Sequence, residues 1–553
     1  MLAGATGTGD GDPITAIRRR TTVAIRRHRV YLVVVLAALL ALLLFVPKSS
    51  PPGISQSTTT IHVAGGITPP NPSYAHGTAI NGVKCGTNVR QVPWSAYAPP
   101  CEPAWHGNNG GTTTRGVTGT TITISYREAS TSQLAELYAL VPPAVIGTNA
   151  EEIATLRAYI NAFNKNFELY GRHVVLVPFA GKGDFIDEDL GEDQAQAQED
   201  AVTVASSVKA FADMSLVDSS AVYSTDLAAQ HVIASSLYEN ELSWSQQYAP
   251  WEYTPGPNCT KAAIGTAAIL GKQLGGLPAS ESGDPALKTG PRVYGLVYPQ
   301  NPQAAACAKS DVSALERYHQ KVVRSVGVEF SLAQLVQQSE NAVAQMKAAG
   351  VTTIIVSSAD PITPTFMMQA ADKQGYYPEW WFQSYFAGGE TDTDALTRLF
   401  PADQRDHIIS TGNQAMPLAQ QEAVRAYNIG NQTPGVKPIP SFIFTYQSIL
   451  QLFDALQLAG PDLTPQNFQA AMRLIPRSVP GGMLGGWNGK DGPFDASSGY
   501  KVVKYDNSSI SGLDGLRGAF VSCDGGKEYS YDAHGSDVPR HQQLSCSSGA
   551  AGP

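Results

Sequence analysis

The sequence has none of the short motifs that mark the commonest catalytic and nucleotide-binding sites. It contains no HExxH, no GxSxG and no GxxxxGK[ST], so the usual signatures of zinc peptidases, serine hydrolases and P-loop proteins are missing. Ser, His and Asp are plentiful, but no spacing among them singles out a catalytic triad. We therefore expect a protein that is not an enzyme and needs no cofactor. An unrecognised envelope hydrolase stays open as an alternative.

Cysteine is scarce, and the few cysteines lie far apart. No pair forms CxxC and no spacing matches a zinc site, so a structural metal is not expected. An even number with wide spacing is typical of disulfides formed in an oxidising compartment, with buried free thiols as the alternative. Closure between nearest neighbours predicts the pairs Cys85–Cys101, Cys259–Cys307 and Cys523–Cys546.

Charged residues make up only 15% of the 553 residues, and basic residues are in the minority. The formal net charge is −9, and six Arg lie within residues 1–29, so the rest of the chain is more acidic still. Because nucleic acid is a polyanion, this balance argues against nucleic acid as a partner. The chain is too long for a single core, so we expect two or more lobes.

A run without any charge covers residues 30–46 (VYLVVVLAALLALLLFV) and ends at Pro47. At about 1.5 Å per residue such a helix reaches roughly 25 Å, the short end of a membrane span. The basic tail, residues 1–29, should stay in the cytoplasm, which places everything after Pro47 outside. We expect an uncleaved, single-pass anchor in the cell membrane and an extracytoplasmic main domain. A cleaved signal peptide is the alternative.

Residues 47–115 are rich in Pro, Gly, Thr and Ser and show no sustained period, which is typical of a linker. Within this linker, Cys85 and Cys101 bracket a short segment that contains Trp94 and Tyr97. A disulfide between them would order a small loop. We expect the loop to staple the linker to the main body, with a docking surface for a partner as the alternative.

Strand-like and helix-like segments alternate between residues 291 and 385. The predicted strands are 291–298, 325–330, 351–358 and 380–385, and the predicted helices are 301–321, 340–349 and a segment capped by Thr363 with Pro364 at its first position. Such alternation makes parallel βαβ units with right-handed crossovers. Two or three of these units build one doubly wound lobe.

The same alternation occurs earlier in the chain. The predicted strands are 121–126, 173–179, 212–217 and 231–235, and the predicted helices are 151–169, 193–210, a short one beginning at Leu227, and 262–274. The β-α-β-α-β pattern thus recurs in two halves. We expect a first lobe mainly within residues 116–285 and a second lobe mainly within residues 290–380.

Several stretches, in order along the chain, resemble one family. They are 116–126 (GVTGTTITISY), 161–179 (NAFNKNFELYGRHVVLVPF), 341–358 (NAVAQMKAAGVTTIIVSS), 370–382, 445–460 (TYQSILQLFDALQLAG) and 492–505 (GPFDASSGYKVVKY). From Gly116 to Asp532 the chain resembles the type I periplasmic solute-binding proteins, such as the leucine/isoleucine/valine-binding proteins of ABC importers. The resemblance implies an α/β fold with two doubly wound lobes joined by a hinge, within residues 116–535, followed by a tail of residues 536–553.

Candidate site residues follow from the architecture. An open α/β sheet binds ligands beyond the carboxyl ends of its strands, and between two lobes the crevice is the default site. In the first lobe the residues at these ends are Tyr126, Arg127, Glu128, Ser219, Ser220, Ser235, Ser236 and Tyr238. In the second lobe they are Tyr298, Gln300, Asn301, Ser357, Ser358 and Asp360. We expect the ligand between the loops 235–238 and 357–360, with residues 126–128 at the base.

The resemblance implies that hydroxyl and backbone N–H groups around Ser235 and Ser236 bind the ligand, since several neutral donors can hold a carboxylate. Arg127 would pair with an anionic part. The ligand is then a small polar molecule, such as an amino acid or a related organic anion. However, this loop has no Thr, and the second-lobe loop reads Asn301-Pro302-Gln303 instead of the family's Tyr-Gly. Both departures argue against an α-amino acid.

The leading hypothesis is a membrane-anchored, extracytoplasmic solute-binding protein. Its lobes would close on the ligand by hinge motion and then deliver it to an ABC permease or report it as a sensor. The sequence contains no ATPase or permease segment, so transport would need partner chains. A receptor-like or envelope scaffold whose crevice binds no solute is the runner-up.

Overall fold

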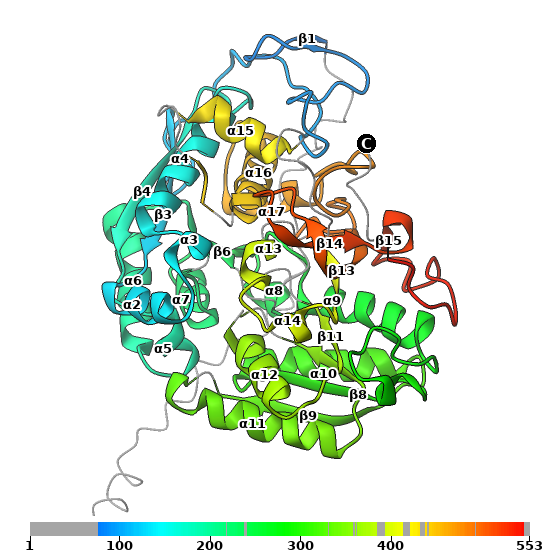
Figure 1. Cartoon of the computed structure of the whole chain (residues 1–553). Helices are drawn as coiled ribbons and strands as arrows, with labels where there is room; N and C mark the ends of the chain where they lie inside the picture. The colour runs from blue at the N-terminus through cyan, green and yellow to red at the C-terminus, as the bar shows by residue number, and fades with distance from the viewer. Residues whose placement is uncertain are drawn as a thin grey trace, which may run out of the picture. The chain divides into compact units, whose positions relative to one another are not determined.

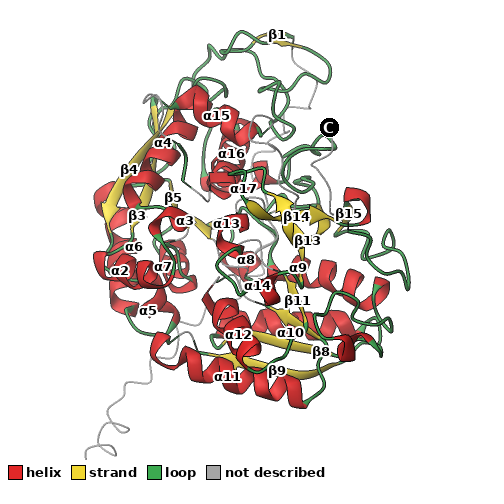
Figure 2. Cartoon of the chain, in the orientation of Figure 1, coloured by secondary structure: helices red, strands yellow, loops and turns green. Residues whose placement is uncertain are grey.

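The computed structural model describes residues 76–216, 218–236, 240–329, 331–357, 360, 362–383, 393–412, 421–431, 437–439, 442–492 and 494–546. These residues belong to one unit, Pro72–Pro553, which is built around two β-sheets (Figure 1, Figure 2). The expected anchor, residues 30–46, lies outside the described residues. Among the described helices, none is long and apolar enough to cross a membrane.

The first sheet consists of five parallel strands in the spatial order β4-β3-β5-β6-β7. Their bounds are β3 Thr121–Glu128, β4 His173–Ala180, β5 Ala212–Leu216, β6 Ile233–Ser236 and β7 Glu252–Tyr253. The central strand β5 is buried along its whole length, as expected for a parallel strand that is covered on both faces. The carboxyl ends of these strands therefore lie along one edge of the sheet.

The helices of the first lobe come from two distant parts of the chain. The earlier ones are α2 Thr131–Leu140, α3 Pro143–Ile146, α4 Asn149–Asn164, α5 Phe185–Asp189, α6 Gln194–Thr203 with a π-helical turn over Val204–Val208, α7 Ala221–Ala229 and α8 Leu242–Tyr248. The later ones are α15 Glu422–Gly430, α16 Phe442–Ala459 and α17 Pro465–Met472.

The two groups of helices share one aromatic core. Phe163 of α4 lies 5.8 Å from Tyr446 and 5.3 Å from Phe453, both on α16, between ring centroids. At Gly430 the end of α15 touches the backbone of α4 so closely that a Cβ atom there would collide with the carbonyl of Ala158. In Figure 1, α15 and α16 lie beside α4 although roughly 270 residues separate them, and their contacts agree. The first lobe is thus completed by a late segment of the chain.

The second sheet has the order β14-β13-β12-β11-β10-β8-β9, with β15 paired to β13. Its strands are β8 Tyr294–Pro299, β9 Val322–Val328, β10 Thr353–Val356, β11 Glu379–Phe382, β12 Ile408–Gly412, β13 Gly499–Ile510, β14 Arg517–Ser522 and β15 Tyr529–Ser530. The strands β8 to β12 run parallel, whereas β13 joins β12 antiparallel. The core of this sheet is therefore the parallel arrangement that the alternating pattern predicts.

Helices cover both faces of the second sheet. They are α9 Cys259–Thr266 with a π-helical turn over Ala267–Gln273, α10 Pro302–Glu316, α11 Leu332–Ala348, α12 Ile362–Lys373, α13 Asp394–Thr397 and α14 Ala402–Arg405, with single 3-10 turns at Pro285–Lys288 and Asp524–Gly526. Ile354 and Trp380 point to the core that contains α11 and α12, whereas Ile355 and Trp381 point to the core that contains α9 and α10. This period of two buries both faces of the strands.

The chain passes between the lobes three times. Tyr253 packs in the first-lobe core and Ala263 in the second, so the first crossover lies between β7 and α9. The second lies between β12 and α15, and the third between Ala496 and Tyr500. The helix expected at 262–274 therefore packs on the second lobe. The change of lobe comes near residue 255, earlier than the expected boundary near 285.

The structure contains the three disulfides that the sequence analysis predicts. The loop closed by Cys85–Cys101 packs on the first lobe. The short paired strands β1 Gly77–Thr78 and β2 Lys84–Cys85 precede it. The ring of Tyr97 lies 4.8 Å from that of Trp487, and its hydroxyl donates to the Leu484 carbonyl at 2.8 Å. The loop thus acts as the expected staple.

Some local predictions are wrong. Ser220 caps α7, so this helix begins at Ala221. Leu227, the predicted start, lies near its end at Ala229. Asp360 accepts hydrogen bonds from the N–H groups of Ile362 and Thr363, so the cap of α12 is Asp360 and Thr363 lies inside the helix. α11 begins eight residues before its predicted start at 340, and β12 was not predicted. At α7 and α12 a single capping side chain sets the start of the helix, and β12 depends on pairing with β11 and β13. Neither feature has a periodic signature.

Candidate functional site

Arg127 lies near the carboxyl end of β3, where the sequence analysis places the base of the site. Its guanidinium donates to Glu188 through two nitrogens at 2.6 and 3.2 Å, to Asp200 at 3.5 Å and to the Asp218 carbonyl through Nε at 3.0 Å and also through Nη2. These bonds engage all five of its N–H groups. The side chain also lies 3.9 Å from the ring centroid of Tyr223, and the residue is 1% exposed. This corrects the expected role, because no N–H is left for an anionic ligand.

The neighbours of Arg127 are also satisfied within the lobe. Tyr126 donates to a carboxylate oxygen of Asp218 at 3.0 Å, and burial raises the pKa of Asp218 to about 7 against the opposing pull of Arg127. The Ser220 hydroxyl donates to Glu188, and Ser219 bonds Ser224 at 3.0 Å. Glu128 ends β3 and is half-buried. This edge of the first sheet mainly holds its own helices in place.

The other first-lobe candidates lie at the end of β6. Ser235 is buried beside Tyr253 of the neighbouring strand β7. Ser236 is the last residue of β6, and nothing beyond its backbone is described. Tyr238, like Ser358 in the second lobe, lies outside the described residues. The predicted position of the ligand between these two loops stays a prediction.

Several of the second-lobe candidates make contacts within their own lobe. Asn301 caps α10 by accepting from the Ala304 N–H at 2.8 Å, and Asp360 caps α12. Gln300 has an exposed side chain, and its N–H donates to the Val328 carbonyl at 2.8 Å. Tyr298 is half-buried in β8 against Gly327 of β9. Caps of this kind fix where the helices begin, at the same edge of the sheet as the crevice.

Ser357 belongs to a buried polar cluster at the carboxyl ends of β10 and β11. Gln383, directly after β11, donates through Nε2 to Asp311 at 2.6 Å and to Thr266 at 2.8 Å. Trp381 donates to the same hydroxyl of Thr266 at 3.0 Å. Burial raises the pKa of Asp311 to about 7, while hydrogen bonds from Gln383 and Ser357 oppose the rise. Of this cluster, the sequence analysis singled out only Ser357.

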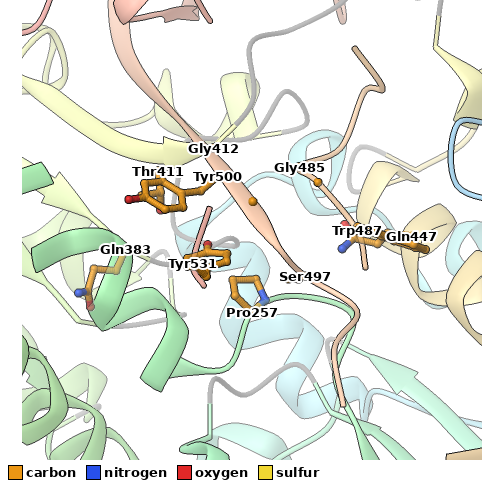
Figure 3. A pocket seen from close by; sticks show the side chains of 12 residues that line it. Pro257, Gln383, Thr411, Gly412, Gln447, Gly485, Trp487, Ser497, Tyr500 and Tyr531 are labelled. Atoms are coloured by element: carbon orange, nitrogen blue, oxygen red, sulfur yellow. The ribbon is translucent and has the colours of Figure 1, made fainter. Parts of the chain in front are cut away.

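A cavity of about 40 Å³ adjoins this cluster, and Figure 3 shows its lining side chains. Its walls come from both lobes and are formed by Pro257, Gln383, Thr411, Gly412, Gln447, Gly485, Gly486, Trp487, Ser497, Gly499, Tyr500 and Tyr531. Pro257 and Ser497 lie in the first and third crossovers, and Gly412 is the last residue of β12, directly before the second. The cavity therefore lies beside the connections between the lobes.

The lining of the cavity is aromatic and neutral. Trp487, Tyr500 and Tyr531 supply rings, and Gln383 and Gln447 supply amides. Gln447 of α16 donates to the Pro255 carbonyl, which ties the first lobe to the first crossover. The sequence analysis missed this cavity, because it places Gln383 inside the predicted strand 380–385 and names no residue around Trp487 as a candidate. Thr411 and Gly412 lie at the carboxyl end of β12. A prediction of this strand would have made them candidates by the same strand-end rule.

The lobes also touch away from the crossovers. Ser310 of α10 donates to Glu241, just before α8, at 2.6 Å. Ile186 of α5 is buried in the same apolar cluster as the second-lobe residues around Val343 and Met367. Leu137, Leu140 and Phe185 pack against that cluster as well. In the part of the chain that the structure describes, no group of three or more His, Cys, Asp or Glu side chains could hold a metal ion.

Comparisons with known proteins give the family. The sequence model of a family described as periplasmic binding protein matches residues 147–509, well over half of the chain. No curated protein matches the sequence.

Solved structures give the same fold at low sequence identity. The fatty acid ABC transporter substrate-binding protein from Thermomonospora curvata is 15% identical, with a TM-score of 0.52, 78% of this chain and 98% of that chain covered. The Leu-, Ile-, Val-, Thr- and Ala-binding protein from Brucella ovis, in its closed conformation, is 14% identical, with a TM-score of 0.52 and coverages of 77% and 98%. The solute-binding protein from R. palustris in complex with 4-hydroxybenzoate is 14% identical, with a TM-score of 0.50 and coverages of 74% and 96%.

Proposed function

Because the chain belongs to the periplasmic binding protein family, a family of ligand-binding proteins rather than enzymes, we propose that it is an extracytoplasmic protein that captures a small polar solute between its two lobes. The observation that carries this proposal is the cavity that both lobes line beside their connections. A solute in such a place contacts both lobes only while they are closed. Its binding energy then favours the closed state over the open one.

The solute is passed on by partner chains. Residues 30–46 anchor the protein in the cell membrane with the basic tail in the cytoplasm, and residues 47–75 tether the domain outside. An ABC-type permease or a sensor then distinguishes the closed domain from the open one. The similar proteins from T. curvata and R. palustris are binding proteins of ABC transporters, which supports the importer as the first partner to test.

Solute capture is tested by thermal unfolding of the purified full chain with amines, amino acids, sugars and organic anions. A solute at 100 times its dissociation constant adds about 2.7 kcal/mol to the free energy of unfolding and raises the melting temperature. Small-angle scattering with the same solute should show a smaller radius of gyration. If no solute raises the melting temperature, the receptor-like scaffold becomes the better hypothesis.

Topology is tested separately, with protease added to intact spheroplasts. The main domain should be degraded while the tail of residues 1–29 is spared. Recovery of a soluble mature form that begins after Pro47 would replace the anchor with a cleaved signal peptide. This outcome would leave the proposed solute capture untouched.

A further inference from the structure

We propose that the cavity between the lobes binds its solute through a protonated amino group, so that the protein selects amines and rejects carboxylates of similar size. This inference rests on the proposed function, because it assigns a ligand class to the same site. Three independent features of the cavity carry it: the aromatic walls, the charges behind the walls and the space between them.

The aromatic walls suit a cation. Trp487, Tyr500 and Tyr531 are 1%, 3% and 4% exposed, and the rings of Tyr500 and Tyr531 lie 4.8 Å apart between centroids (Figure 3). The face of an aromatic ring carries partial negative charge, and it attracts an ammonium group within about 6 Å of the ring centroid. The buried hydroxyl of Tyr500 has no hydrogen-bond partner in the described part of the chain.

The charges directly behind the walls are mostly negative. Asp311 accepts from Gln383, which lines the cavity, and the Glu528 carboxylate lies against Gly486 and Gly499, two further lining residues. Lys261 donates to the carbonyl of Ser497, but its charge is matched by Asp495 at 2.7 Å. An anion in the cavity would be repelled by these carboxylates, whereas an ammonium group would be attracted.

Arg127, the cation that the sequence suggests for a carboxylate, is not available to one. The five N–H groups of Arg127 are all engaged within the first lobe. The N–H of Gly499 is donated to the Gly486 carbonyl. The sequences that follow β10, β11 and β12, residues 358–359, 384–392 and 413–420, contain no Lys, Arg or His. A carboxylate that enters loses its hydration without gaining an ion pair, which is costly.

The space suits a small head group. A volume of about 40 Å³ holds a few water molecules, and an –NH₃⁺ group is close to water in size and in its demand for acceptors. Thr411, Ser497 and Gly485, which carry hydroxyl or carbonyl oxygens, line the same space. The head group would sit among acceptors from both lobes. The remainder of the solute would then extend out of the cavity.

The test compares solutes with the same four-carbon skeleton on the full chain in detergent. Putrescine, 1,4-butanediol and succinate carry positive, zero and negative charge, and their dissociation constants are measured by calorimetry at pH 7.5. We expect putrescine to bind at least tenfold more tightly than the diol, and succinate to show no binding. If succinate binds as tightly as putrescine, or the diol does, the amine inference is overturned while solute capture stands. If none of the solutes in the wider panel binds, the proposed function fails instead.

Variants separate the charge effect from folding. Asp311→Asn should weaken putrescine binding roughly ten- to a hundredfold, because it removes the carboxylate behind Gln383. Asp394→Asn is the matched control: this buried carboxyl of the second lobe bonds Ser511 and Phe520 away from the cavity, so affinity should not change. Equal losses in both variants would mean a general structural effect and would overturn the role of Asp311.

A second pair of variants tests the aromatic wall. Tyr500→Leu should weaken binding of putrescine about fivefold or more, because the ring face is lost. Tyr500→Phe keeps the ring and should retain most of the affinity. If Leu and Phe weaken binding equally, the hydroxyl rather than the ring holds the solute, and the cation–π part of the inference is wrong.

Discussion

The carboxyl edges of the two sheets carry similar side chains and use them in opposite ways. In the first lobe, Arg127 and its acidic partners form a closed network whose donors are all satisfied inside the lobe. In the second lobe, Gln383 links Asp311 to the wall of a cavity that the other lobe completes. A charged residue at a strand end is therefore not by itself a ligand contact. What decides its role is whether its own lobe already supplies all of its partners.

The second lobe also has a buried arginine, but at the other end of its sheet. Arg292, just before β8, pairs with Glu379 at the start of β11 through two bonds of 2.8 and 2.9 Å, and both side chains are fully buried. This pair stiffens the amino end of the sheet, away from the crevice. The second lobe thus keeps its buried ion pair and its polar cavity wall apart, whereas the first lobe places its network at the crevice edge.

The largest expected effect comes from breaking the first-lobe network. Arg127→Met leaves Glu188 and Asp200 without their buried counter-charge, and should lower the free energy of unfolding by about 3–5 kcal/mol. Urea denaturation measures the loss. Lys182→Met is the control, because its pair with Glu199 is exposed to solvent, and it should leave the urea midpoint nearly unchanged. Normal stability together with lost solute binding would return Arg127 to the ligand-binding role that the sequence suggested.

The pH dependence of stability provides the next test. Burial raises the pKa of Glu152 to about 8 and that of Asp218 to about 7 in the first lobe, and the pKa of Asp394 to about 7 in the second. The folded state then holds protons that the unfolded state releases above about pH 4. Each group should therefore lower the free energy of unfolding as pH rises through its folded pKa, by up to about 1.4 kcal/mol per pH unit.

The measurement is urea denaturation between pH 5 and pH 8. Glu152→Gln and Asp218→Asn should each flatten the fall in stability over this range, since the amides cannot ionise. In the second lobe, Asp394→Asn should do the same. A wild-type protein that becomes more stable from pH 5 to pH 8 would contradict the assignment of these carboxyls as buried and protonated.

The smallest expected effect concerns the contact between the lobes. Ser310→Ala removes the hydrogen bond to Glu241 and should shift the closed state by about 0.5–1.5 kcal/mol, which is at most about tenfold in solute affinity. Ser206→Ala is the control, because Ser206 bonds only within its own helix, to the Val202 carbonyl. Small-angle scattering without solute should show a larger radius of gyration for Ser310→Ala alone. Identical scattering curves for both variants would show that this bond does not hold the lobes.

The fold could be predicted from the sequence because its signals are local. Residues 354–356 and 380–382 are apolar at every position, as strands buried on both faces require, and the two cores confirm that alternate side chains face opposite helices. The three disulfides join neighbours along the chain, so nearest-neighbour pairing found them. Two of the boundaries that failed, the starts of α7 and α12, depend on single capping side chains.

The site was harder to predict because its partners are distant in sequence. Arg127 and Glu188 are 61 residues apart in the sequence. The pattern of apolar and polar residues around either one does not predict their ion pair. The cavity joins Pro257, Gln383, Trp487 and Tyr531, which meet only because the chain crosses between the lobes three times. The ends of the predicted strands indicate which edge of the sheet binds a ligand. Which residues on that edge face the ligand depends on the tertiary structure.

The apolar contact of α5 with the second lobe has a kinetic consequence. Ile186 is buried among second-lobe side chains, so separating the lobes exposes apolar surface to water and costs free energy whether or not a solute is present. A solute can enter only during the fraction of time that the lobes are apart, which lowers the observed association rate constant by that fraction. The same contact delays escape once the lobes have closed. The protein would then sample its surroundings slowly and retain what it captures.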